Sequence, residues 1–174
     1  MATDTRYLTG IFPDRESAEV AYQGVLDRGY DKDDVNLVMS KETRERHFGN
    51  DSQKTTELGN KAAEGAGIGA GLGGVIGAVG AAIAAVGTSI AIPGLGLVIA
   101  GPIAAALAGA GAGGAAGGLV GALVGWGIPE ERIKQYEGGI RDGGILMGVN
   151  PRNDEDATHL EGHWRGARGA NIYR

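Results

Sequence analysis

Hydrophobic positions near the N-terminus of the chain alternate between strand-like and helix-like spacing. Residues 7–12 and 35–39 are short apolar runs of strand length. Between them, Asp14 is suited to cap a helix and Gly29 to end it. The apolar residues of this helix recur at steps of three and four: Ala18, Ala21, Tyr22, Val25 and Leu26. Residues 1–42 therefore predict a β-α-β unit. The polar stretch that begins at residue 41 lacks a clear period and predicts a linker over residues 43–60.

Similar patterns return after residue 128. Pro129, followed by two glutamates, favours a helix start, and Gly143-Gly144 favours its end. The apolar face of this helix consists of Ile133, Tyr136 and Ile140. Residues 145–149 predict a third strand, which completes the second half of the domain at residues 129–151. Residues 152–174 predict an amphipathic tail helix and a short edge strand, the helix with Ala157, Leu160, Trp164 and Ala167 on its apolar face.

These pieces predict an α+β fold. None of them buries a core alone, but three or four short strands with helices on one face form a small split β-α-β sheet of ferredoxin-like type. The sheet must join residues 7–39 to residues 144–150, and a long apolar segment separates the two. The ends of that segment therefore have to lie close together.

The central segment has no charged residue from Gly65 to Pro129. An even number of helices brings its two ends together, and Pro93-Gly94 and Pro102 mark a bend. We predict a long Gly/Ala-rich antiparallel helical hairpin over residues 61–128 that interrupts the sheet domain. Its arms are expected at residues 61–88 and 102–127, with the stretch IAIPGLGLVIAG as the loop between them.

Glycine recurs at four-residue intervals in both arms of this hairpin. Each interior glycine costs a helix roughly 0.5–1 kcal/mol relative to alanine, so close packing has to offset the cost. Steps of four align the glycines along one face of each helix, where the lack of side chains lets two backbones approach closely. We predict a helix-packing interface made of Gly65, Gly69, Gly73, Gly77, Gly109, Gly113, Gly117, Gly121 and Gly125.

Two surroundings suit the remaining apolar faces of the arms. Each arm is long enough to cross a bilayer, which takes about 20 mostly apolar residues. The flanking cations Lys61, Arg132 and Lys134 then favour both termini on the cytoplasmic side, and Trp126 suits the membrane interface. In the alternative, the hairpins pack against copies of themselves in a cytoplasmic oligomer or filament. The expected partners are therefore the chain itself and membrane lipid.

Composition narrows the classes of function. The 34 glycines show no G-X-Y period, which excludes collagen. The absence of cysteine excludes disulfides and thiolate chemistry, and the net charge of -5 argues against nucleic acid as the main partner. The N-terminal residues MATDTRYLTG lack the pattern of a secretory signal.

Candidate catalytic and ligand-binding motifs are weak. GxGxxG matches begin at Gly69 and at Gly109, but neither follows a predicted strand. His159 and His163 have the i, i+4 spacing of metal ligands, yet HLEGH is not HExxH and no third ligand is fixed by spacing. Two solvated histidines are the commoner outcome of such a pair. We therefore expect no enzyme activity, no cofactor and no small-molecule substrate, with a metal site at these two histidines as the weaker alternative.

The chain resembles the bacterial general stress protein family (YflT-like, also labelled low-temperature-induced proteins). The resemblance is carried by LVGALVGWGIPEERIKQYEGGIRDGGILMGV at residues 119–149 and by the opening YLTGIFPDRESAEVAYQGVLDRGYDKDDVNLVMS. It implies a role in stress tolerance and a helical hairpin for membrane contact or assembly, and it brings no assigned site residue. We expect a non-enzymatic stress protein that self-associates and associates with membrane. A soluble structural polymer is the alternative.

Overall fold

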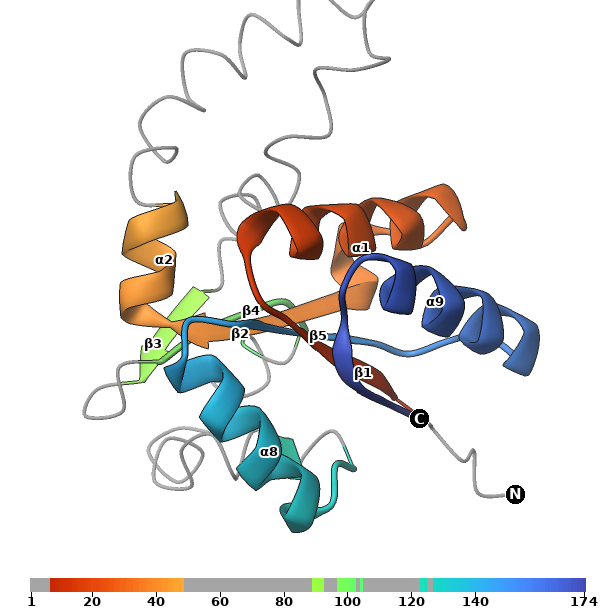
Figure 1. The fold of residues 1–174 in the computed structure, drawn as a ribbon. Coiled ribbons are helices and arrows are strands. Elements are labelled where there is room, and N and C mark those ends of the chain that lie inside the picture. The colour runs from red at the N-terminus through yellow and green to blue at the C-terminus, as the bar shows by residue number, and fades with distance from the viewer. Residues whose placement is uncertain (1–6, 49–88, 93–96, 103, 105–122, 125–126) are drawn as a thin grey trace, which may run out of the picture.

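The chain folds into a mixed sheet-and-helix domain, which confirms the α+β class. The computed structural model describes residues 7–48, 89–92, 97–102, 104, 123–124 and 127–174. Six strands form one antiparallel sheet in the order β3-β4-β2-β5-β1-β6. Figure 1 shows helices on both sides of this sheet. We expected three or four strands with helices on one face. The sheet instead has six strands, and helices lie on both of its faces.

The centre of the sheet is a split β-α-β unit. β1 (Leu8–Phe12) and β2 (Val35–Ser40) run parallel to one another, because each pairs antiparallel with β5 (Ile145–Val149), which lies between them. α1 (Arg15–Asp27) and a short 3-10 turn (Lys32–Asp34) connect β1 to β2. Asp14 caps α1 by accepting a hydrogen bond from the Ser17 amide, as the sequence predicts. The predicted joining of the two halves of the chain in one sheet is confirmed.

Helices cover the two faces of the sheet with separate cores. α1 and α9 (Asp154–Gly166) lie side by side on one face, where Tyr22 and Trp164 are buried against β1, β2 and β5. α8 (Glu130–Arg141) packs on the opposite face through its three predicted apolar residues, Ile133, Tyr136 and Ile140. The tail ends in β6 (Ala170–Tyr173), which pairs with β1 at one edge of the sheet.

The predicted loop between the hairpin arms is wrong. Its residues form β3 (Ser89–Ile92) and β4 (Leu97–Ala100), and β4 pairs with β2 from Leu37↔Ala100 to Ser40↔Leu97. All four residues of β4 are buried, and they contribute to both cores. The flanking prolines and glycines suggested a bend. The short apolar run LVIA between them, with β-branched Val98 and Ile99 at its centre, instead gains more by joining the sheet beside β2.

The predicted start of the polar linker is also wrong. Residues Lys41–Phe48 form α2, directly after β2. Ser40 caps this helix by accepting a hydrogen bond from the Thr43 amide at 3.0 Å. The helix carries almost no apolar stripe, so hydrophobic periodicity could not reveal it. Serine before a polar run was the available signal.

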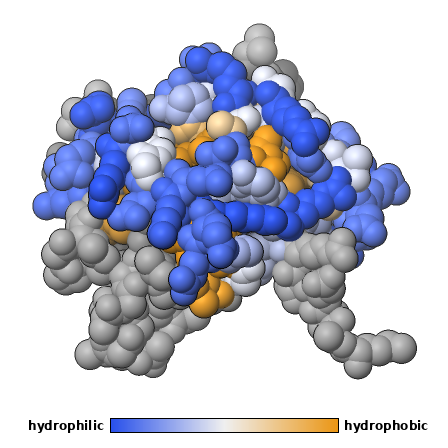
Figure 2. Space-filling view, turned by 60° about the horizontal axis from the view of Figure 1, so that its bottom comes forward, coloured by the Kyte–Doolittle hydropathy of each residue, from blue (hydrophilic) through white to orange (hydrophobic). Residues whose placement is uncertain are grey.

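The predicted helical arms lie almost entirely outside the described residues. Of the segment 102–127, the structure describes Pro102, Ala104, Leu123, Val124 and Gly127. No helix within the described parts of the chain combines the length and hydrophobicity that crossing a membrane would need. Figure 2 shows that the face carrying α8 is mostly hydrophilic, with hydrophobic residues visible in a limited area between polar side chains.

Candidate functional site

The nine glycines of the predicted interface lie outside the described residues. The two histidines of the tail helix are described, and they have different surroundings. His159 is exposed on α9. His163 instead turns toward α1, where its Nε2 lies 2.9 Å from the carbonyl oxygen of Val20. Gly24 leaves the room for this imidazole, since a Cβ there would collide with the His163 ring. His163 therefore has a packing role between α1 and α9, and no group of three or more metal-ligating side chains occurs in the described residues.

A buried carboxylate joins the C-terminal end of α1 to the start of α9. Asp156 accepts hydrogen bonds from the Tyr30 hydroxyl at 2.7 Å and from Arg28 Nε at 2.6 Å. These two bonds hold the pKa of Asp156 below its ordinary value of 3.8. Arg152 stacks over the Tyr30 ring at 4.1 Å and donates its backbone N–H to the Tyr30 hydroxyl. Because these donors and acceptors satisfy one another, the cluster is structural.

A second polar cluster fixes β6 against α8. The buried Tyr136 hydroxyl donates to the Asn171 carbonyl at 2.8 Å and lies 2.8 Å from the Thr9 hydroxyl. Burial raises the pKa of Tyr136 to about 12, so this hydroxyl stays protonated at neutral pH. Arg132 stacks over the neighbouring Tyr173 ring at 4.4 Å. The cluster holds the C-terminal strand in place and leaves no group poised for proton transfer.

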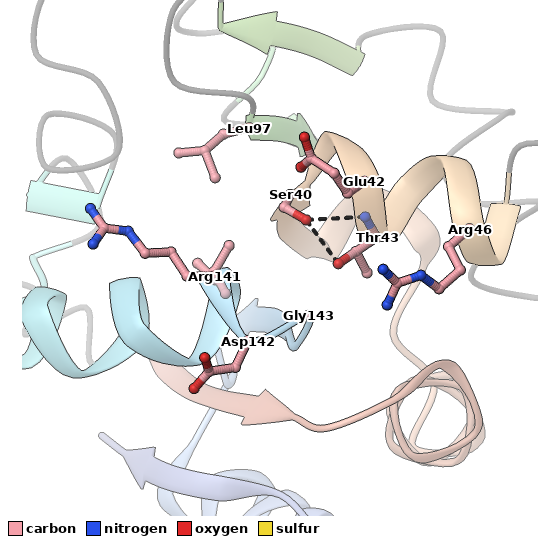
Figure 3. A pocket seen from close by; sticks show the side chains of 9 residues that line it. Ser40, Glu42, Thr43, Arg46, Leu97, Arg141, Asp142 and Gly143 are labelled. Carbon is pink, nitrogen blue, oxygen red and sulfur yellow. Dashed lines mark hydrogen bonds between the residues drawn. The ribbon is translucent and has the colours of Figure 1, made fainter.

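A pocket of about 380 Å³ lies where α2, β4 and the end of α8 meet. It is lined by Ser40, Glu42, Thr43, Arg46, Leu97, Ile140, Arg141, Asp142 and Gly143 (Figure 3). The hydroxyls of Ser40 and Thr43 lie 2.9 Å apart and are hydrogen-bonded to one another. Arg46 and Arg141 lie on opposite sides of the pocket in Figure 3. No local pattern predicts this pocket, because its walls come from three separate stretches of the chain, residues 40–46, 97 and 140–143.

The chemistry of this pocket does not favour a reaction centre. Ser40 is occupied as the cap of α2, and among the pocket residues its hydroxyl has no imidazole or carboxylate partner to act as a base. Arg141 forms an ion pair with Glu137 at 2.7 Å, outside the pocket. The lining carries both acidic and basic groups on an open surface, without convergence on one ligand group.

The described residues next to the two glycine-rich segments show where these segments join the domain. α2 ends at Phe48, before the polar stretch 49–60 and the first glycine-rich segment, and the described chain resumes with β3 at Ser89. β4 and the following Ala104 precede the second segment, and Leu123 marks its return. Ala104 and Leu123 are both buried in the core beneath α8. The described residues that flank both glycine-rich segments therefore belong to one domain.

Comparisons with known protein families, with curated proteins and with solved structures find no match to this chain.

Proposed function

We propose that this chain is a non-enzymatic stress-response protein that self-associates through its glycine-rich segments and associates with membrane. The α+β domain serves as the base of the assembly. The glycine-rich segments supply the contacts, with both termini on the cytoplasmic side. The stress-response part of the proposal rests on the resemblance of residues 119–149 to the general stress protein family.

One structural observation gives the strongest support to a domain that serves as the base and glycine-rich segments that supply the contacts. The sheet holds β3 and β4 between the two glycine-rich segments, so each segment is flanked at both ends by described elements of one domain. The first segment is flanked by α2 and β3. Ala104 and Leu123, at the boundaries of the second, share one core. A domain that flanks both segments suits the proposed role as the base of an assembly.

Anchoring at both ends also changes the proposed membrane geometry. The uncharged part of the connection between α2 and β3 runs from residue 65 to residue 88. A hairpin within these roughly 24 residues has arms of about 12 residues, or about 18 Å, which is shorter than the apolar thickness of a bilayer. The connection between Ala104 and Leu123 gives arms of only about 14 Å. We propose that the first segment enters the bilayer from one side and the second packs nearer its surface. A single hairpin with its far bend at residues 89–101 is replaced by this arrangement.

The glycine faces provide the proposed contact between copies. Gly109, Gly113, Gly117, Gly121 and Gly125 follow one another at steps of four in the second segment. A helix with such a face loses stability in isolation and regains it when a second backbone packs closely against it. The same holds for Gly65, Gly69, Gly73 and Gly77 in the first segment.

The test of this contact is a pair of neighbouring substitutions in the second segment. Gly117→Leu places a side chain on the proposed glycine face, and Gly118→Leu places the same side chain about 100° away around the helix. Sedimentation velocity of the full chain is expected to show a large assembly for wild type and for Gly118→Leu. The Gly117→Leu assembly is expected to be reduced at least several-fold in mass.

Equal assembly of the two variants would contradict the role of the glycine face. A wild-type chain that sediments as a monomer at all concentrations would contradict self-association altogether. Tryptophan fluorescence checks that the domain core is intact in both variants, because Trp164 is fully buried against Phe12 at a ring-centroid separation of 5.5 Å.

A further inference from the structure

The sheet has two edge strands, and their backbones differ in what already occupies them. β3 pairs with β4 along its whole length, from Ser89↔Ala100 to Ile92↔Leu97. On its other side it pairs with none of the strands that the structure describes. Figure 1 shows β3 at the end of the sheet opposite to β6. An unpaired strand edge presents a row of N–H and C=O groups that a further strand can satisfy.

β6 is protected against such pairing. Its register against β1 shifts between Thr9 and Ile11, and Asn171 has a left-handed backbone with φ of 49°. The Asn171 carbonyl accepts the Tyr136 hydroxyl, and the Arg174 carbonyl accepts Arg132 Nη1 at 3.1 Å. Bulges, irregular dihedral angles and occupied carbonyls are the usual means by which a sheet edge avoids a neighbour.

β3 pairs with β4 without a register shift and has neither a charge nor a proline. It reads Ser-Ile-Ala-Ile, without proline, and lies inside the uncharged stretch between Gly65 and Pro129. Two such edges can approach without bringing like charges together, although the whole chain carries a net charge of -5. The glycine-rich segments on either side consist mainly of Gly and Ala, which are poor strand formers. The best strand partner that this sequence offers to β3 is therefore β3 of another copy.

We propose that β3 is a homotypic pairing edge, at which two copies join their sheets antiparallel about a two-fold axis. The contact is self-complementary, because each copy presents the same strand to the other. With one residue on the axis, the pairing takes in at most three residues of β3 from each copy and is marginal alone, so it adds to the glycine-face contacts. The inference rests on the proposed self-association and names a second surface for it.

Single-cysteine cross-linking tests this pairing directly, since the chain has no cysteine of its own. The variants are Ser89→Cys, Ile90→Cys, Ala91→Cys and Ile92→Cys, with Ala170→Cys on β6 as the matched edge control. Directly opposed residues of antiparallel strands have Cα atoms about 4.5–5.5 Å apart, within the range of a disulfide. In a two-fold pairing, only the residue on the axis faces its own copy.

The expected result is a disulfide-linked dimer at one β3 position, with at least several-fold less at its neighbours and at Ala170→Cys. Absence of such a maximum, in a protein that still sediments as an assembly, would overturn the β3 inference and leave self-association standing. Equal cross-linking at every position, including the control, would overturn it as well, because it indicates random collision. A monomeric protein would overturn both this inference and the proposed function.

Discussion

At the scale of single residues, the domain uses its polar groups and its glycines for packing. Asp156 and Tyr136 each connect segments more than a hundred residues apart in the chain. Gly24 gives space to His163, and Gly139 gives space to the Ile11 side chain. Of the two histidines considered as metal ligands, His163 is therefore explained by packing.

Two adjacent glycines in α8 provide a matched test of this packing. A Cβ added at Gly138 would meet nothing within 4 Å, whereas one added at Gly139 would collide with the δ-methyl of Ile11. Gly138→Ala is therefore expected to raise the free energy of unfolding by about 0.5–1 kcal/mol through helix propensity. Gly139→Ala is expected to be less stable than Gly138→Ala, because the δ-methyl of Ile11 has to move to make room for the added Cβ. Urea denaturation of both variants checks the prediction, and equal shifts would contradict the position of α8 on the sheet.

The Asp156 cluster makes a prediction about pH. The pKa of Asp156 is held below 3.8 by the bonds from Tyr30 and Arg28, so the folded protein favours the carboxylate. The stabilisation of the folded state by the Asp156 carboxylate is fully present at pH values above the pKa of Asp156 in the unfolded chain. It is lost as the pH falls through the lower folded pKa. Asp156→Asn should therefore be less stable than wild type at pH 7, and the difference should shrink as the pH falls below 3.8. Thermal unfolding at several pH values measures this, and a difference independent of pH would contradict it.

At the scale of elements, β4 decides whether residues 89–101 belong to the domain. Ile99 is fully buried and lies opposite Val38 in the sheet. Ile99→Ala is expected to lower the free energy of unfolding by about 2–5 kcal/mol. The control Val124→Ala removes a side chain that is 48 % exposed, and it should change stability by less than about 0.5 kcal/mol. If Ile99→Ala behaved like the control, residues 89–101 would be a loop remote from the sheet.

Helices and strands were predicted from sequence where local caps and apolar spacing specify them, and were missed where they depend on distant partners. The elements with clear caps and apolar spacing were predicted correctly: β1, α1, β2, α8, β5, α9 and β6. α2 was missed because its stability depends on the Ser40 cap and neighbouring contacts rather than on an apolar stripe. β3 and β4 were missed because four-residue strands next to Pro and Gly are specified by their neighbours in the sheet, β2 for β4 and β4 for β3. Such pairing depends on distant residues, which no local pattern contains.

The pocket and the polar clusters could not be predicted from sequence either, because their residues are far apart in the chain. Ser40, Leu97 and Asp142 come together only when β2, β4 and α8 meet. The Tyr30–Asp156 bond joins residues 126 positions apart. Sequence spacing did suggest a histidine pair at His159 and His163, but the fold turns one of them into the α1–α9 interface.

At the scale of the whole molecule, the domain and the glycine-rich segments have different tasks in the account proposed here. The described surface on the side of α8 is mostly hydrophilic, as expected for a base that stays in water (Figure 2). The stretch from Gly65 to Pro129 contains no charged residue. Association with lipid and with other copies is therefore expected to depend on those segments and to leave the fold of the base unchanged.

The measurement that tests this account most directly is density-gradient flotation of a lysate containing the untagged chain, repeated after an alkaline wash. Peripheral proteins are released by the wash, whereas segments that enter the hydrocarbon region stay with lipid. The account predicts that the chain floats with lipid both before and after the wash. Sedimentation as dense, lipid-free particles would contradict membrane association and show that the glycine-rich segments pack against protein alone.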